Sequence, residues 1–139
     1  MAQEPDPRTP ADDLREQAAV TARLEELLGD RSEREVALVT RLVSGFPAKA
    51  SGLVEQWRTA VLQGEHGEAV RAVHTLKGTA LNLGSTTLSR VCQEIESWSR
   101  DGDPECEAVH RERLVSAVAA FARTMAGATA GHRTGAPQR

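Results

Sequence analysis

The segment "RAVHTLKGTALNLG", residues 71–84, combines two side chains that could do chemistry with a glycine close to them on one helix. His74 could act as a nucleophile or a metal ligand through one nitrogen of its neutral imidazole. Lys77 brings a compact positive charge, which suits an incoming or attached phosphoryl group. Gly78 costs a helix about 1 kcal/mol relative to alanine, so it requires a reason of packing or of access.

Helical spacing places these three residues on one stripe, together with Leu81, beside the core stripe of the same helix. The core stripe consists of Ala69, Val73, Leu76, Ala80 and Leu83. His74 therefore lies at the edge of the core and faces outward. Plainer alternatives are a hydrogen-bonded core histidine, a solvated lysine and a glycine at a close helix crossing. Against them, lysine is rare in this chain, with two lysines to fifteen arginines.

A nucleophilic imidazole also needs a partner for its second ring nitrogen. The turn at Gly84 follows His74 by about ten residues, and an equal distance back along an antiparallel helix, at about 1.5 Å per residue, reaches Ile95 and Glu96. A Glu96 carboxylate that accepts from one nitrogen would leave the other free and facing solvent, as a phosphoacceptor requires. The alternative is that Glu96 is a surface residue in a charged series with Glu94.

The elements that must position these residues are helices, because apolar residues recur with period 3.6 and no long stretch alternates with period 2. We expect helices from Thr9 and Pro10 to Gly29, from Ser32 to about Val61, from His66 to Leu83, from Ser85 or Thr86 to a stop at Gly102, and from Asp103 and Pro104 onward. Short connections make neighbouring helices antiparallel. The predicted fold is all-α, an up-and-down antiparallel four-helix bundle with an additional N-terminal capping helix.

The apolar stripe of the second helix keeps its phase through "SGFPAKASG". This favours one long helix, kinked at Gly45 and Pro47, over two helices joined by a loop. The predicted inward residues are Val36, Val39, Leu42, Phe46, Leu53, Trp57 and Val61 in this helix, Leu88, Val91, Cys92, Ile95 and Trp98 in the fourth, and Val115, Val118, Phe121, Ala122 and Met125 in the last.

The length of 139 residues fits one domain. Residues 1–8 and 127–139 contain almost nothing apolar and are expected to be disordered tails, which leaves residues 9–126 as the folded domain. The N-terminus lacks a signal-peptide pattern and no stretch could span a membrane, so we expect a cytoplasmic protein. A net charge of −3 gives no reason to expect nucleic acid or a membrane as the partner.

The remaining candidate residues form no further site. Cys92 and Cys106 make neither a disulfide framework nor a zinc site, and we interpret them as structural thiols. We place His66 in a turn, His110 at a helix surface and His132 in a tail, with no carboxylate or cysteine arrangement around them. The pattern therefore argues against an autonomous enzyme and against a metal site.

The segments "HTLKGTALNLG" and "LSRVCQEIE" together resemble the histidine phosphotransfer (HPt) domain of two-component phosphorelays, with its H-x-L-K-G signature. The resemblance extends from about Val36 to Met125. It implies that His74 is phosphorylated, that Lys77 stabilises the phosphoryl group, that Gly78 leaves clearance, and that Glu96 orients the imidazole.

The resemblance also implies a phosphoryl carrier without kinase or ATPase activity. Its partners would be response-regulator receiver domains and sensor histidine kinases, hybrid kinases included, and we expect it to be a monomer. It would need no cofactor, because the receiver supplies the Mg²⁺. The chain departs from the family pattern at Val73, where alanine is common, at Ala69, which replaces a larger residue, and at the bulky Leu81. These positions bear on the contour on which a receiver docks.

Two other interpretations remain open at this point. The chain could be a helical scaffold that binds a receiver or kinase without being phosphorylated, with His74 as a surface residue. It could also be a detached substrate domain of a chemotaxis-type kinase, which would share the glutamate at position 96.

Overall fold

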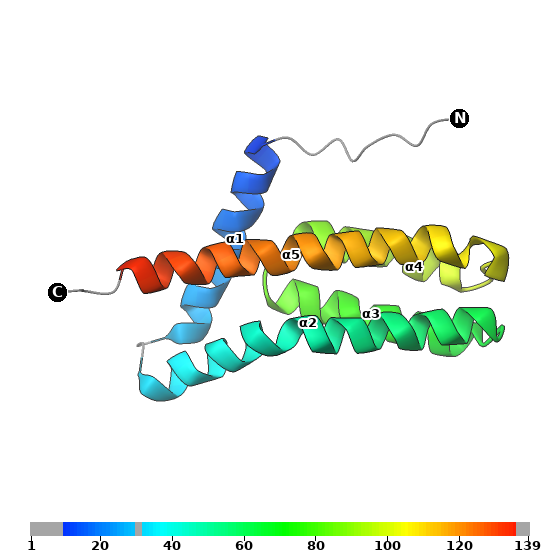
Figure 1. Ribbon diagram of the computed structural model, residues 1–139, viewed down its shortest axis with the longest axis horizontal. Helices are drawn as coiled ribbons and strands as arrows, with labels where there is room; N and C mark the ends of the chain where they lie inside the picture. The colour runs from blue at the N-terminus through cyan, green and yellow to red at the C-terminus, as the bar shows by residue number, and fades with distance from the viewer. Residues whose placement is uncertain (1–9, 30–31, 136–139) are drawn as a thin grey trace.

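The computed structural model describes residues 10–29 and 32–135, with side chains placed for 14–29 and 32–128. These ranges form α1 (Pro10–Leu28), α2 (Glu33–Leu62), α3 (His66–Asn82), α4 (Thr86–Ser99), a 3-10 turn η1 (Pro104–Cys106) and α5 (Glu107–Gly135) (Figure 1). Within them there is no strand, and the predicted all-α class is confirmed.

Side-chain caps fix where three of the elements begin, as the sequence predicted. The hydroxyl of Ser32 accepts from the amide of Glu35 at 3.2 Å, and that of Ser85 accepts from the amide of Leu88 at 3.1 Å. The carboxylate of Asp103 accepts from the second amide after it at 2.9 Å, at the start of η1, which leads directly into α5. Each bond satisfies an amide that has no partner within its own helix.

Glycine ends three of the helices. Gly29 (φ 55°) follows α1, and Gly64 (φ 73°) and Gly84 (φ 93°) follow the C-caps of α2 and α3, all in the left-handed region that favours glycine. Gly102, predicted to end α4 in the same way, has another function. A Cβ atom there would lie 2.7 Å from ring carbons of Trp98, so this glycine lets the indole pack against the backbone.

The second helix is continuous over 30 residues and contains Pro47 in its interior. This confirms one long helix over two helices with a loop. In Figure 1 the N-terminal part of α2 slants relative to the remainder. A proline inside a helix removes one hydrogen bond and crowds the preceding turn, which accounts for a change of direction without a break.

The helices pack side by side around one core. α3 contacts α2 and α4, α5 contacts the same two helices, and α1 packs on α5 and α2. Figure 1 shows α2 to α5 aligned with the long axis of the molecule, whereas α1 crosses them. In the core, Phe46 and Phe121 meet edge to face at 5.1 Å between ring centroids, and the indole N–H of Trp57 donates to the hydroxyl of Ser99 at 2.8 Å.

The predicted stripe of α3 is confirmed, since all five of its residues are buried. Two other stripes need correction. In α5, Leu114 is fully buried whereas Val115 is 50% exposed, so the inward face is shifted by one residue at that point. In α2, Val36 and Leu42 are 43% and 37% exposed, because this part of the helix has fewer neighbours than the part that faces α3.

The folded part also extends further than predicted at the C-terminal end. α5 continues to Gly135 instead of ending at residue 126, and Ala128 is buried. The predicted cap Thr9, the N-terminal segment 1–8 and residues 136–139 lie outside the described residues. No helix in the described part is long and apolar enough to cross a membrane.

Candidate functional site

The four predicted site residues lie together on the pair of helices joined by the turn at Gly84. His74, Lys77 and Gly78 lie on α3, and Glu96 lies opposite them on α4. The tight turn makes the two helices pack along their length, so residues at equal distances from it come level. The structure thus brings Glu96 to His74, at the height that the sequence predicted.

The imidazole and the carboxylate differ sharply in exposure. Nδ1 of His74 is 3.2 Å from Oε2 and 3.3 Å from Oε1 of Glu96. The histidine side chain is 63% exposed and the glutamate side chain only 8%. A carboxylate that accepts from Nδ1 fixes the tautomer in which the proton is on Nδ1 and the lone pair on Nε2. The ring is therefore held from the protein side while most of it faces solvent.

Lys77 is not a solvated surface lysine. Its side chain is only 16% exposed, and its Nζ atom is 2.9 Å from Oε1 of Glu96. The same ammonium group donates to Oε1 of Gln93 at 2.8 Å. The lysine therefore lies across the seam between α3 and α4. Glu96 contacts its ammonium group and the imidazole of His74 at the same time.

Burial and charge act in opposite directions on Glu96. Burial alone raises the pKa of its carboxyl group, but hydrogen bonds from Lys77 and His74, and the positive charge of the lysine, outweigh burial and hold the pKa below its ordinary value. A guanidinium nitrogen of Arg100 lies 3.8 Å from Oε2 and adds to the positive surroundings. Glu96 is therefore ionised at neutral pH.

Gly78 lies on the exposed side of α3, one turn after His74. A Cβ atom at this position would meet no other atom within 4 Å. A close helix crossing is thus excluded as the reason for the glycine. The space above it is open, which leaves access to the neighbouring imidazole as the explanation that fits.

Cys92 is buried beside this group. Burial raises the pKa of its thiol to about 12, a rise that the nearby Lys77 reduces and Glu96 increases. The thiol is therefore neutral and takes no part in nucleophilic chemistry at physiological pH. Among the described residues no group of three His, Cys, Asp or Glu side chains could hold a metal ion.

Of the other three histidines, His66 and His110 have described side chains. His66 is the first residue of α3, and the side chain of His132 is outside the described residues. His110, predicted at a helix surface, is instead half-buried, and its ring lies 4.3 Å from that of Trp98, between centroids. The correction follows from the same one-residue shift that buries Leu114.

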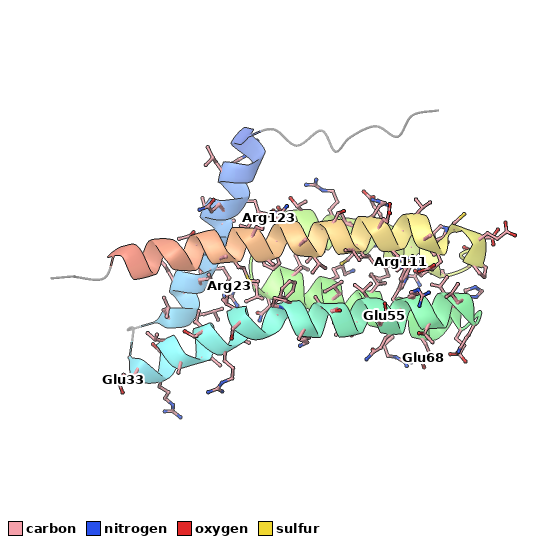
Figure 2. The ribbon with its side chains drawn as sticks, viewed as in Figure 1. Arg23, Glu33, Glu55, Glu68, Arg111 and Arg123 are labelled. Atoms are coloured by element: carbon pink, nitrogen blue, oxygen red, sulfur yellow. The ribbon has the colours of Figure 1, made fainter. Side chains whose placement is uncertain are left out.

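Sequence reasoning missed two residues of α1 that hold the turn between α3 and α4. The carboxylate of Glu16 accepts from the hydroxyl of Ser85 at 2.7 Å and from the amide of Thr87 at 2.9 Å. Arg23, labelled in Figure 2, donates to the backbone oxygen of Asn82 at 2.7 Å. These bonds cap the end of α3 and the start of α4, the two helices that carry the site.

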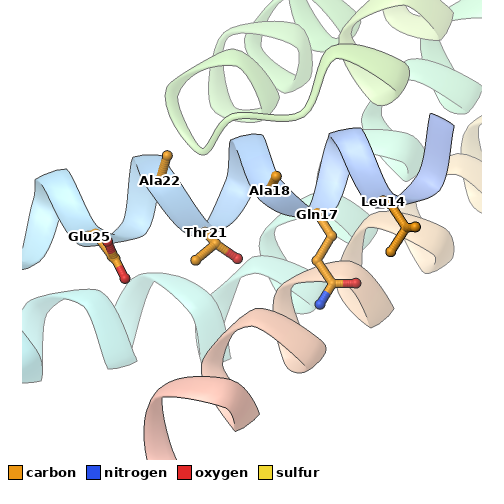
Figure 3. Close-up of a pocket in the computed structure, with 6 residues that line it drawn as sticks. All are labelled: Leu14, Gln17, Ala18, Thr21, Ala22 and Glu25. Carbon is orange, nitrogen blue, oxygen red and sulfur yellow. The ribbon is translucent and has the colours of Figure 1, made fainter. Parts of the chain in front are cut away.

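The shallow hollow on α1 does not extend the site. Its lining comes from a single helix and consists of Leu14, Gln17, Ala18, Thr21, Ala22 and Glu25 (Figure 3). Only one of these six side chains, that of Glu25, is titratable, and a single carboxylate makes no catalytic or metal-binding arrangement.

Gln93, in contrast, belongs to the site and was missed. The signal available for it was its spacing of three residues before Glu96, level with Lys77.

Comparison with known protein families gives a match. The family model of the Hpt domain matches residues 41–124, which include all of α3 and α4 and the four predicted site residues. No curated protein and no solved structure matches the chain.

Proposed function

Because the chain belongs to the Hpt domain family, we propose that it carries phosphoryl groups between the proteins of a phosphorelay, with His74 as the phosphorylated residue. The observation that carries the proposal is the pairing of an exposed imidazole with a buried, ionised carboxylate, Glu96, at 3.2 Å. The partners would be response-regulator receivers and sensor histidine kinases, hybrid kinases included.

In the proposed reaction the Nε2 lone pair of His74 attacks the phosphorus of a receiver's aspartyl phosphate. A P–N bond forms, the P–O bond breaks, and the aspartate leaves as a carboxylate. The Nδ1 proton stays on the ring and faces Glu96, which stabilises the positive charge that the ring gains. Lys77 contributes a cation near the incoming phosphoryl oxygens, and Gly78 leaves room for the partner's loops.

The reverse reaction passes the group to another receiver, which supplies the Mg²⁺. The proposal assigns no ATP, metal or cofactor to this chain and no kinase or ATPase activity. It places the protein in the cytoplasm as a monomer. Its fold would be an up-and-down antiparallel four-helix bundle of α2 to α5 with α1 as a cap, supported by the ring of contacts among these helices and the crossing of α1.

Transfer of label from a phosphorylated receiver tests the proposal. We expect the wild type to take up the label, and His74→Gln to take up none although it folds. Phosphorus NMR should show a phosphohistidine signal in the wild type alone. Labelling that persists in the variant would remove His74 from the reaction, and receiver binding without a phosphohistidine signal would instead favour a scaffold.

Glu96→Ala separates orientation from folding in the same assay. We expect this variant to stay folded and to accept label about 10- to 100-fold more slowly, because its imidazole keeps the nucleophilic nitrogen but loses its orienting partner. Circular dichroism provides the check of the fold. An unchanged transfer rate would remove Glu96 from the mechanism.

A further inference from the structure

Gln93 is the one polar contact of Lys77 that the reaction above does not use. Its Oε1 atom accepts from Nζ of Lys77 at 2.8 Å, and the lysine is 2.9 Å from Glu96 through the same ammonium group. An ammonium group has three donors. Two of them are directed to α4, which leaves one for a third acceptor.

The two helices explain why Gln93 can reach Lys77. Lys77 follows His74 by three residues on α3, and Gln93 precedes Glu96 by three residues on the antiparallel α4, so the two pairs lie at neighbouring heights across the same seam. Residues three apart on a helix share a face. Gln93 contacts the ammonium group of Lys77, whereas Glu96 contacts both the lysine and the imidazole of His74.

A free lysine side chain has considerable rotamer entropy, which is lost when the ammonium group is held in one place. The low exposure of Lys77, 16%, shows that this side chain is already held before any phosphoryl group arrives. The carboxylate alone would allow the ammonium group to rotate about a single contact. A second acceptor on the same helix restricts that rotation.

We propose that Gln93 is a positioning residue for phosphotransfer, which holds Lys77 so that its third N–H is available to the phosphoryl group on His74. The inference rests on the proposed function of His74. It differs from the role of Glu96, because Gln93 acts on the lysine and leaves the imidazole unchanged. A small anionic phosphorus–nitrogen donor, phosphoramidate, can test it without any receiver, since its P–N bond breaks with release of ammonia as the bond to Nε2 forms.

The kinetic test compares Gln93→Leu, Gln93→Glu and Gln63→Leu with the wild type. We expect Gln93→Leu to slow phosphorylation of His74 roughly 3- to 10-fold, the effect of losing one partly exposed hydrogen bond to a charged group. Gln93→Glu keeps an acceptor of equal reach and should restore most of the rate. Gln63→Leu, an exposed substitution of the same type at the end of α2, should have no effect.

A double-mutant cycle shows whether Gln93 acts through the lysine. In a Lys77→Met background we expect Gln93→Leu to cause no further loss. A loss that persists without the lysine would overturn the proposal, as would an unchanged rate in Gln93→Leu itself.

NMR of the lysine ammonium groups tests the positioning directly, and the chain has only two lysines, Lys49 and Lys77. We expect the Nζ hydrogens of Lys77 to exchange with water more slowly than those of the exposed Lys49, and Gln93→Leu to reduce the difference, because Glu96 still accepts from Lys77. If the lysine responds but the wild type takes up no phosphoryl group, the proposed function fails and the contact stands. If His74 is phosphorylated but the lysine signal is unchanged, the positioning role fails alone.

Discussion

Gly78 is a residue whose cost to the fold is not offset by any contact within the chain. A methyl group at this position would meet nothing within 4 Å, so the free protein could accept alanine without a steric clash. Glycine in the middle of a helix is less favourable than alanine because it loses more conformational freedom on folding. No contact within the described structure requires glycine here, and the proposed docking of a partner on α3 supplies a reason for it.

Gly78→Ala should accordingly raise stability and lower activity together. We expect a gain of roughly 0.5–1 kcal/mol in the free energy of unfolding and a several-fold slower transfer from a phosphorylated receiver, because the methyl group stands beside the approach to His74. Urea denaturation and a transfer assay measure the two effects.

Gly52→Ala is the matched control, since a Cβ atom there also meets nothing within 4 Å and the residue lies on α2. It should stabilise the protein by a similar amount and leave transfer unchanged. Unchanged transfer in both variants would show that Gly78 gives no clearance to the partner.

At the scale of the helices, α1 holds the turn that aligns α3 with α4. The carboxylate of Glu16 accepts a hydrogen bond from the first turn of α4, and the guanidinium of Arg23 donates one to the last carbonyl of α3. Gly84 makes this approach possible, because a Cβ atom there would lie 3.1 Å from the side chain of Arg23 and 3.2 Å from the backbone of α1. Charges of opposite sign thus lie at the helix ends that they stabilise.

Glu16→Ala should show how much these hydrogen bonds contribute to the free energy of unfolding. The substitution leaves the buried hydroxyl of Ser85 and the part-buried amide of Thr87 without their acceptor, and we expect a loss of roughly 1–3 kcal/mol in the free energy of unfolding. Hydrogen exchange should become faster at the amide of Thr87. The control is Glu55→Ala, whose side chain is 63% exposed and whose loss should change stability little. A variant as stable as wild type would mean that water replaces Glu16 fully.

The helices and the position of the site could be predicted from sequence because their signals are local. Caps at Ser32 and Ser85, glycines at helix ends and a 3-4 apolar rhythm each extend over a few residues. The position of Glu96 opposite His74 could be predicted by counting residues on both sides of the tight turn at Gly84. Contacts such as that between Glu16 and Thr87, 71 residues apart, leave no periodic trace, and a single sequence could not reveal them.

The wrong predictions for α5 and the failure to predict Gln93 have physical causes as well. The last helix is rich in alanine and small residues, so several neighbouring stripes are almost equally apolar and the choice between Leu114 and Val115 depends on which helices pack there. The same composition made the segment after residue 126 look unable to bury anything, whereas Ala128 is small enough to pack closely. Gln93 was missed because an exposed glutamine becomes informative only when its partner is known.

At the scale of the whole molecule, three buried or half-buried groups make the free energy of unfolding fall as the pH decreases. Burial raises the pKa values of Glu16 and Glu96, but hydrogen bonds outweigh it and hold both below the ordinary value of 4.5. These carboxylates stabilise the fold above that value and less as the pH falls through their folded pKa values. Burial, with a smaller effect of Arg113, lowers the pKa of His110 below its ordinary 6.5.

The histidine should produce the first step of acid destabilisation. Below about pH 6.5 the unfolded chain binds a proton at His110 that the folded protein does not, so the free energy of unfolding falls as the pH decreases. Within the described structure its Nδ1 atom is buried without a hydrogen-bond partner, and the ring packs on Trp98. A proton there would add a charge that nothing compensates.

His110→Phe, which keeps an aromatic ring against Trp98, should flatten the dependence between pH 7 and pH 5 and leave the carboxylate step below pH 4.5 in place. Urea denaturation at four or five pH values measures both steps. A first step of equal size in the variant would assign the effect to another group. Phosphotransfer to His74 at pH 7.5 should be unchanged, because His110 lies on α5 and outside the site.

The two cysteine thiols should react with a disulfide reagent at very different rates. Cys106 is exposed and can react with a disulfide reagent in the folded state, whereas Cys92 is buried, with its thiol pKa raised to about 12. Since the thiolate is the reactive form, Cys92 can be modified only when α3 and α4 come apart locally. The rate at which Cys92 is modified therefore measures how often α3 and α4 separate near the contact between His74 and Glu96. The measurement uses the unaltered protein and needs no label at the site.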